Sequence, residues 1–180
     1  MRQFIVACLI AAGGCSQGPG EQSDWERKHE ERLTPTEQVV PLPPYPRRAE
    51  LVEFFVAATS EFRFFVDSAS LSVGSDGIVR YVLVARSAAG VENVSFEGMR
   101  CETGEVRTYA LGRDGAWVAR AGEWRTIPAR SVQRWHNALY REYFCPQRQP
   151  VASAREGVDA LRRGGHPLSR GFSGDALKQH

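Results

Sequence analysis

The sequence predicts an α+β fold in which an antiparallel meander β-sheet is packed by a C-terminal helix and held by a disulfide staple. Three features predict it: runs of β-branched and aromatic residues have the length of strands, turn dipeptides recur between them, and residues near the C-terminus have helical spacing. The turn dipeptides are Asp76-Gly77, Ala89-Gly90, Thr103-Gly104 and Asp114-Gly115. Turn signals at such regular spacing favour strands that pair in chain order.

Residues 1–15 have the composition of an export signal, because Arg2 provides a positive charge and residues 4–12 are apolar. The apolar run is too short to span a bilayer as a permanent helix. Small residues that end at a cysteine resemble the lipobox of bacterial lipoproteins, in which Cys15 would be acylated, and Ser16 after it resembles the outer-membrane pattern. We therefore expect a periplasmic protein anchored to the outer membrane by lipid at Cys15. An ordinary cleaved signal is the alternative.

A tether and a single domain are expected after the signal. Residues 16–46 are rich in Glu, Gln, Arg and Pro and end in a proline cluster, so we expect a disordered tether without a packed core. One α+β domain is expected over residues 47–164, followed by a flexible tail over residues 165–180. The length of the chain suits a single hydrophobic core.

Strands are expected at residues 51–56, 62–66, 78–86, 91–101, 106–111, 117–119 and 124–127, with residues 69–73 continuing the second. In the run 78–86, alternate positions form one strongly apolar face, and Arg80 and Arg86 make the other face mixed. This alternation predicts a strand inside the sheet rather than at its edge.

The run 91–101 alternates in a similar way. Val94 and Phe96 fall on one face, and Gly98 interrupts the run as an expected bulge that turns Met99 and Cys101 toward the core. The opposite, polar face consists of Asn93, Ser95 and Glu97. We group Glu97 with three other acidic residues around the next turn, Glu92, Glu102 and Glu105. We expect this group to be solvated and paired with arginines rather than to act as acids, bases or cation ligands.

An amphipathic helix is expected over residues 131–144. Its apolar stripe occupies positions i, i+3, i+7 and i+11, which are Val132, Trp135, Leu139 and Tyr143. Ser131 is a suitable N-cap, and Pro146 stops the helix. A second, weaker helix is expected over residues 151–162, ending at two glycines.

The four cysteines indicate one disulfide. Cys8 would leave with the signal and Cys15 would carry lipid, which leaves Cys101 and Cys145 for the oxidising periplasm. We expect them to pair and to tie the end of a strand to the end of the helix. A redox-active pair is the less favoured interpretation, because the Cys-x-x-Cys arrangement that tunes thiol acidity is absent.

Several segments together resemble the cryptic neisserial protein family. They are LPPYP (42–46), FRFFVDSASLSVGSDGIVRY (62–81), ENVSFEGMRC (92–101), YREYFCP (140–146) and ALRRGGHP (160–167). The resemblance covers most of the chain beyond the signal. It implies a periplasmic protein or lipoprotein of a family with no assigned biochemical activity, so it implies no catalytic residues.

Candidate site residues are few. The four histidines show no metal-ligand spacing, no nucleophile elbow occurs, and we expect neither metal nor cofactor. If the domain binds a ligand, the best candidates are His136, Tyr140 and Arg80, although a histidine on a helix flank more often bonds to a neighbouring group.

The functional interpretation is correspondingly general. A formal net charge of +2 gives no long-range reason to expect a nucleic acid partner. We interpret the chain as a lipid-anchored periplasmic module for interaction or envelope maintenance, without catalysis. Its partners would be the membrane, through Cys15, and an envelope protein or peptidoglycan. The alternative is a small-ligand binder or hydrolytic enzyme with a cleft between sheet and helix. A deep polar pocket beneath the helix would favour that alternative.

Overall fold

One antiparallel sheet organises the domain. The computed structural model describes residues 36–128 and 134–169. The strands in these ranges are β1 (Leu51–Phe54), β2 (Phe62–Asp67), β3 (Ser72–Val73), β4 (Ile78–Ser87), β5 (Glu92–Arg100), β6 (Glu105–Arg113), β7 (Ala116–Ala119) and β8 (Arg125–Thr126). They pair in the order β1-β2-β4-β5-β6-β7, with β3 added to β4 and β8 added to β6. The antiparallel sheet predicted from the turn dipeptides is confirmed.

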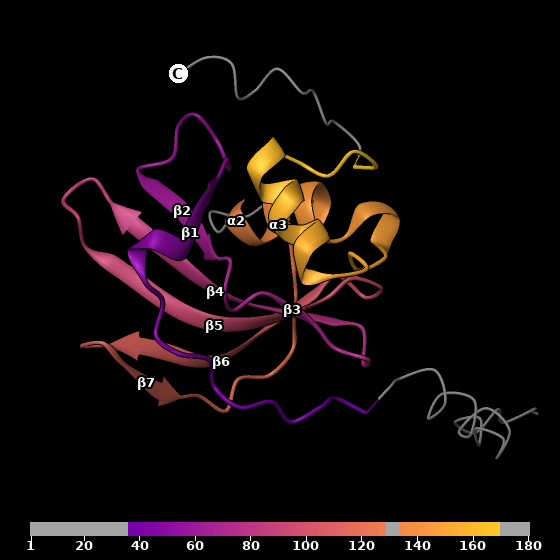
Figure 1. Cartoon of the computed structure of the whole chain (residues 1–180), viewed down its shortest axis with the longest axis horizontal. Helices are drawn as coiled ribbons and strands as arrows, with labels where there is room; N and C mark the ends of the chain where they lie inside the picture. The colour runs from indigo at the N-terminus through magenta and orange to yellow at the C-terminus, as the bar shows by residue number, and fades with distance from the viewer. Residues whose placement is uncertain (1–35, 129–133, 170–180) are drawn as a thin grey trace, which may run out of the picture. The chain divides into compact units, whose positions relative to one another are not determined.

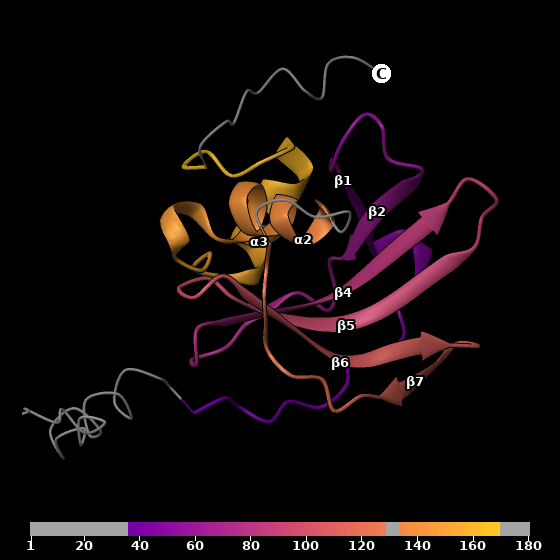
Figure 2. The same cartoon turned by 180° about the vertical axis from the view of Figure 1, so that it is seen from behind.

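Helices in the described residues are short, and those that follow the strands in the chain lie on one side of the sheet (Figure 1). They are the 3-10 helices η1 (Arg48–Glu50) and η3 (Pro146–Arg148), the α-helices α2 (Arg134–Ala138) and α3 (Ala154–Arg163), and the π-helix η2 (Leu139–Phe144). Figures 1 and 2 show α2 and α3 together on one side of the sheet, and the chain that leads into β1 on the other. We call the two sides the helix face and the back face.

Strand β4 is buried on both of these faces, since every residue from Ile78 to Val84 is buried. The helix face carries the main core, formed by Val79, Tyr81, Leu83, Met99, Leu139, Tyr143, Phe144, Val158 and Leu161 among others. The back face carries a second apolar cluster, formed by Phe65, Val82, Val84, Val94, Phe96 and Ala110. Removing both faces from water is strongly favourable, so each face needs a cover.

The predicted helix over residues 131–144 ends at Phe144 as expected, but its second half is a π-helix rather than an α-helix. Ser131 and Val132 lie outside the described residues, and the chain is α-helical only to Ala138 before it widens into the π-helix η2. The Cys145 N–H donates to the Tyr140 carbonyl, a spacing of five residues that is typical of a π-helix. Both Tyr143 and Phe144 of this turn lie in the main core, whereas the predicted stripe contained only Tyr143.

The predicted disulfide is confirmed. Cys101 and Cys145 are bonded with their Cα atoms 5.2 Å apart, and both are buried. The bond joins the chain just after β5 to the chain just after η2. It closes a loop with a sequence separation of 44, for which chain entropy predicts a stabilisation of about 4 kcal/mol at most.

The compact unit begins at Thr36 rather than at Arg47. Residues 36–46, which the sequence analysis places in the tether, run along the back face. The Glu37 carboxylate accepts hydrogen bonds from Arg107, Tyr109 and Trp124 at 2.8 to 2.9 Å. Val40 and Tyr45 pack against the back-face cluster, so this segment is the cover that the apolar back face needs.

A buried ion pair fastens the same segment. The Arg80 guanidinium donates to both Asp76 carboxylate oxygens, at 3.0 and 2.6 Å, and both side chains are only 1% exposed. Gln38 bridges the pair, because its N–H donates to Asp76 and its carbonyl accepts from Arg80. Burial alone would raise the pKa of Asp76, but the Arg80, Gln38 and Ile78 donors outweigh it and lower that pKa to about 2.

We therefore predict that Asp76→Asn destabilises the domain by about 3 to 5 kcal/mol at pH 7, because it leaves the Arg80 charge buried without its partner. A lowered carboxyl pKa stabilises the folded state above the usual value of about 3.9, and that contribution is lost as the pH falls toward 2. Urea unfolding at pH 7 and at pH 2.5 measures both effects.

The matched control is Asp114→Asn, since Asp114 is exposed in a turn. An equal loss of stability in the two variants at pH 7 would contradict the assignment of the Asp76–Arg80 pair as a buried support of the back face.

Candidate functional site

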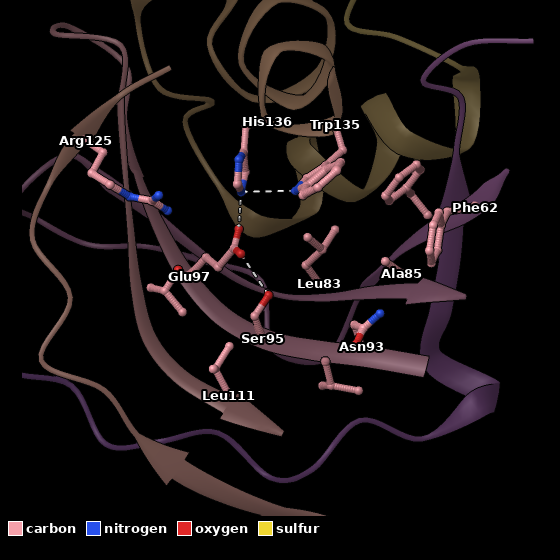
Figure 3. Close-up of a pocket in the computed structure, with 13 residues that line it drawn as sticks. Phe62, Leu83, Ala85, Asn93, Ser95, Glu97, Leu111, Arg125, Trp135 and His136 are labelled. Carbon is pink, nitrogen blue, oxygen red and sulfur yellow. Dashed lines mark hydrogen bonds and ion pairs between the residues drawn. The ribbon is translucent and has the colours of Figure 1, made fainter. Parts of the chain in front are cut away.

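A cleft of about 320 Å³ lies on the helix face beside α2. Strands β2, β4, β5 and β6 contribute its floor and one wall, and α2 forms the facing wall (Figure 3). Apolar surface dominates the lining. The lining residues are Phe62, Phe64, Leu83, Ala85, Asn93, Val94, Ser95, Glu97, Thr108, Leu111, Arg125, Trp135 and His136.

A buried carboxylate lies at the inner end of this cleft. Glu97 is 4% exposed and lies on the same face of β5 as Ser95. A β-bulge in the neighbouring strand accompanies it, because Phe96 pairs with Ala110 whereas Glu97 pairs with Thr108. The extra residue, Tyr109, points to the back face, and a Cβ at Gly98 would lie 2.5 Å from the Tyr109 hydroxyl. Gly98 is therefore required where Tyr109 crosses β5.

Both carboxylate oxygens of Glu97 have hydrogen-bond partners within the domain. His136 Nε2 lies 2.9 Å from Glu97 Oε2, and the Ser95 hydroxyl donates to Glu97 Oε1 at 2.8 Å (Figure 3). Trp135 Nε1 also lies 3.2 Å from His136 Nε2. An indole N–H can only donate, so Nε2 cannot accept from Trp135 while it donates to an ionised Glu97. The shorter contact identifies the Glu97 carboxylate as the partner of the His136 N–H.

The surroundings of Glu97 keep it ionised despite its burial. Burial raises the pKa of this carboxyl, but His136 and the hydroxyls of Ser95 and Tyr81 act in the opposite direction and leave the pKa lowered overall. Burial also raises the pKa of Tyr81, and the nearby Glu97 charge adds to the effect. The Tyr81 hydroxyl is buried and makes no well-formed hydrogen bond within the described residues.

The order of the groups does not suit nucleophilic catalysis. In a catalytic triad the serine bonds to the histidine, and the acid orients the histidine from its other side. Here the carboxylate stands between Ser95 and His136, so within the described residues no serine or cysteine is hydrogen-bonded to the histidine. The arrangement instead provides a fixed polar end to an apolar cleft.

Aromatic residues form the outer part of the cleft. Phe64 and Trp135 stack with ring centroids 5.2 Å apart and an interplanar angle of 25°. Phe62 lies beside Phe64 on the same face of β2 and is 38% exposed. Leu111 on β6 is 37% exposed, so an apolar rim faces the solvent on two sides of the cleft.

The structure separates the three residues predicted as ligand-binding candidates. His136 lines the cleft. The Tyr140 hydroxyl donates to the Cys101 carbonyl beside the disulfide, and Tyr140 lines a different cavity with Arg141 and Arg148. Arg80 lies on the back face, across the sheet from His136, and its charge is taken by Asp76. Cys15, the predicted lipidation site, lies outside the described residues.

Glu97 is the residue that the sequence analysis missed. It was grouped with Glu92, Glu102 and Glu105 as a solvated cluster, whereas it is buried under α2. The predicted alternation of the strand placed it correctly on one face with Asn93 and Ser95. The sequence did contain a signal for this burial. Glu97 lies two residues before Met99, so in a strand both side chains point to the same face, and Met99 lies in the main core.

The described residues also bear on metal binding and on membrane crossing. No group of three or more histidines, cysteines or acidic residues within residues 36–128 and 134–169 is arranged to hold a metal ion. None of the helices in those residues has both the length and the apolar character needed to cross a membrane.

The sequence model of the CNP1-like family matches residues 30–162, well over half of the chain. This match confirms the family resemblance at that level and carries no link to neisserial proteins in particular. No curated protein and no solved structure matches the chain. The matched residues include every lining residue of the cleft.

We predict that the two partners of the buried pair are unequal in their effect on stability. His136→Gln should lower the free energy of unfolding by about 3 to 5 kcal/mol at pH 7, because it leaves the Glu97 carboxylate buried without its main partner. Glu97→Gln should cost less, about 1 to 3 kcal/mol, because it removes the buried charge together with part of its hydrogen bonding. Urea unfolding of both variants and of the double variant measures the coupling.

The pH dependence supplies the control. Because the Glu97 pKa is lowered, its contribution is present above the usual glutamate value of about 4.3 and is lost as the pH falls through the lower folded value. The cost of Glu97→Gln should therefore shrink in acid. Glu92 lies on the same strand as Glu97 but is partly exposed and pairs with Arg86 of β4. Glu92→Gln should therefore lower the free energy of unfolding by about 1 kcal/mol or less at any pH. Equal costs for Glu92 and Glu97 would contradict a buried, functional carboxylate.

Proposed function

We propose a non-catalytic binding role in the cell envelope for this chain, which belongs to the CNP1-like family. Its ligand is a small, largely apolar molecule held in the cleft between the sheet and α2. The observation that carries the proposal is the combination of an apolar cleft of about 320 Å³ with the buried Glu97–His136 pair at its inner end. Ligand sites typically combine apolar walls with a few fixed polar groups.

The polar groups support binding rather than hydrolysis. A hydrolase needs a nucleophile or an activated water within reach of a base, and in the cleft Glu97 occupies the His136 nitrogen at 2.9 Å. A binding site instead needs preorganised walls that do not rearrange when the ligand enters. The Ser95, Glu97 and His136 contacts hold β5 to α2 and so keep the cleft open.

The envelope location in this proposal is supported by the sequence and by one bond. Residues 1–15 have the composition of an export signal that ends at a candidate lipidation site, Cys15. The Cys101–Cys145 disulfide suits an oxidising compartment such as the periplasm. We propose that lipid at Cys15 anchors the chain to the outer membrane and that residues 16–35 connect the anchor to the domain.

A second candidate function is contact with an envelope partner at the connection between β1 and β2. Phe55 is 57% exposed at the start of this connection, and Phe62 is 38% exposed at its end. Exposed aromatic side chains of this kind are enriched in protein interfaces. The two functions are compatible, because Phe62 also belongs to the rim of the cleft.

We predict that Ala85→Trp abolishes most of the binding of a neutral apolar dye, N-phenyl-1-naphthylamine, to the purified domain. Ala85 lines the cleft and is partly exposed, so an indole there would fill the space of the ligand. The Kd measured by dye fluorescence should rise at least about tenfold, which corresponds to about 1.4 kcal/mol.

The matched control is Ala116→Trp, which adds the same side chain at an exposed position of β7. Its Kd should equal that of the unaltered chain, and the thermal unfolding of both variants shows whether they remain folded. Undiminished dye binding by folded Ala85→Trp, or no dye binding by the unaltered chain, would contradict the proposed function.

A further inference from the structure

The charges in the cleft are not equally accessible to a ligand. The Glu97 side chain is 5% exposed, and its two oxygens already contact His136 and Ser95. His136 is 7% exposed at its side chain, and its Nε2 is engaged by Glu97. A ligand that enters the cleft can therefore reach neither the Glu97 carboxylate nor His136 Nε2 without breaking a buried hydrogen bond.

Arg125 is the charged lining residue that remains. It lies on β8 at the side of the cleft and is exposed. Among residues 36–128 and 134–169 no carboxylate forms an ion pair with it. Figure 3 shows the Arg125 side chain extending from the wall toward the interior of the cleft, in the direction of Glu97. A guanidinium in this position suits a carboxylate or phosphate oxygen.

The rest of the cleft sets the shape of the molecule. Leu83, Ala85 and Leu111 line it from the sheet, and Phe62 and Trp135 lie on the side away from Arg125 (Figure 3). A volume of about 320 Å³ lies at the lower end of the range for small-molecule sites, which is about 300 to 1,000 Å³. A hydrocarbon chain of about eight carbons with one small head group suits a site of this size.

We propose that the ligand of this cleft is a medium-chain anionic amphiphile, with its carboxylate on Arg125 and its hydrocarbon chain along Leu83 and Trp135. The inference rests on the proposed function and names the ligand class for the same site. The anionic head lies at the side of the cleft where Arg125 is exposed, and the chain lies over the apolar floor toward Leu83 and Trp135 (Figure 3). This orientation leaves the Glu97–His136 pair intact.

Three probes with the same chain and different head groups test the proposal: octanoate, octanol and octylammonium, each used at neutral pH to displace N-phenyl-1-naphthylamine. Octanoate should displace the dye at a concentration about tenfold below that of octanol, because a charge-assisted hydrogen bond to Arg125 adds to the same apolar contact. Octylammonium should be the weakest of the three, since it places like charge beside Arg125.

Two variants assign the effect to the residue. Arg125→Gln should remove the preference for octanoate and leave the displacement by octanol unchanged. Arg120→Gln, an exposed arginine outside the cleft lining, should keep the preference. Both readouts compare ligands on one folded protein, so a change in stability alone cannot produce the expected pattern.

The outcomes separate this inference from the proposed function. Equal displacement by octanoate and octanol, a preference for octylammonium, or a preference for octanoate that survives Arg125→Gln would overturn the anionic class while the cleft remains a binding site. If the dye itself does not bind the unaltered chain, the proposed function fails and the inference fails with it.

Discussion

The domain depends on a sheet that is apolar on both faces and must therefore be covered twice. The central strand β4 has no solvated face between Ile78 and Val84. On the helix face the cover is formed by η2 and α3, held to the sheet by the Cys101–Cys145 bond. On the back face the cover is the segment 36–46, fastened by Glu37 and by the buried Asp76–Arg80 pair. The cleft lies on the helix face, and among the residues that the structure describes α2 is the helix that contributes to its lining.

Much of this arrangement could be predicted from the sequence, because the relevant signals are local. Strands alternate with period two, turns require glycine, and two cysteines remain once the signal is set aside. The C-terminal end of α3 is of the same kind, since Gly164 adopts a left-handed conformation with φ of 78° where the glycine pair was expected to end the helix. Each of these features depends on a few residues that are close in sequence.

The features that could not be predicted depend on contacts between distant residues. Glu37 is separated from Tyr109 by 72 residues and Glu97 from His136 by 39, so composition alone assigned one to a tether and the other to a solvated acidic cluster. The helix widens at Leu139 into a π-helix in which both Tyr143 and Phe144 are buried, and local helical periodicity does not indicate this change. At the C-terminal end, His166 and Ser169 are likewise buried within the predicted flexible tail, through bonds to the Glu142 carbonyl.

Another cavity lies on the back face, where Glu37 and Val40 of the N-terminal segment face Phe96 and Tyr109. The central claim is that the cleft beside α2, and not this cavity, receives the apolar ligand. The indole N–H signals of the tryptophans test it directly, because Trp135 lines the cleft whereas Trp117 and Trp124 donate to Pro43 and Glu37 on the back face. A nuclear magnetic resonance titration of the ¹⁵N-labelled chain with N-phenyl-1-naphthylamine should shift the Trp135 indole signal and leave the Trp117 and Trp124 signals in place. Movement of the Trp117 and Trp124 signals with an unchanged Trp135 would contradict the account.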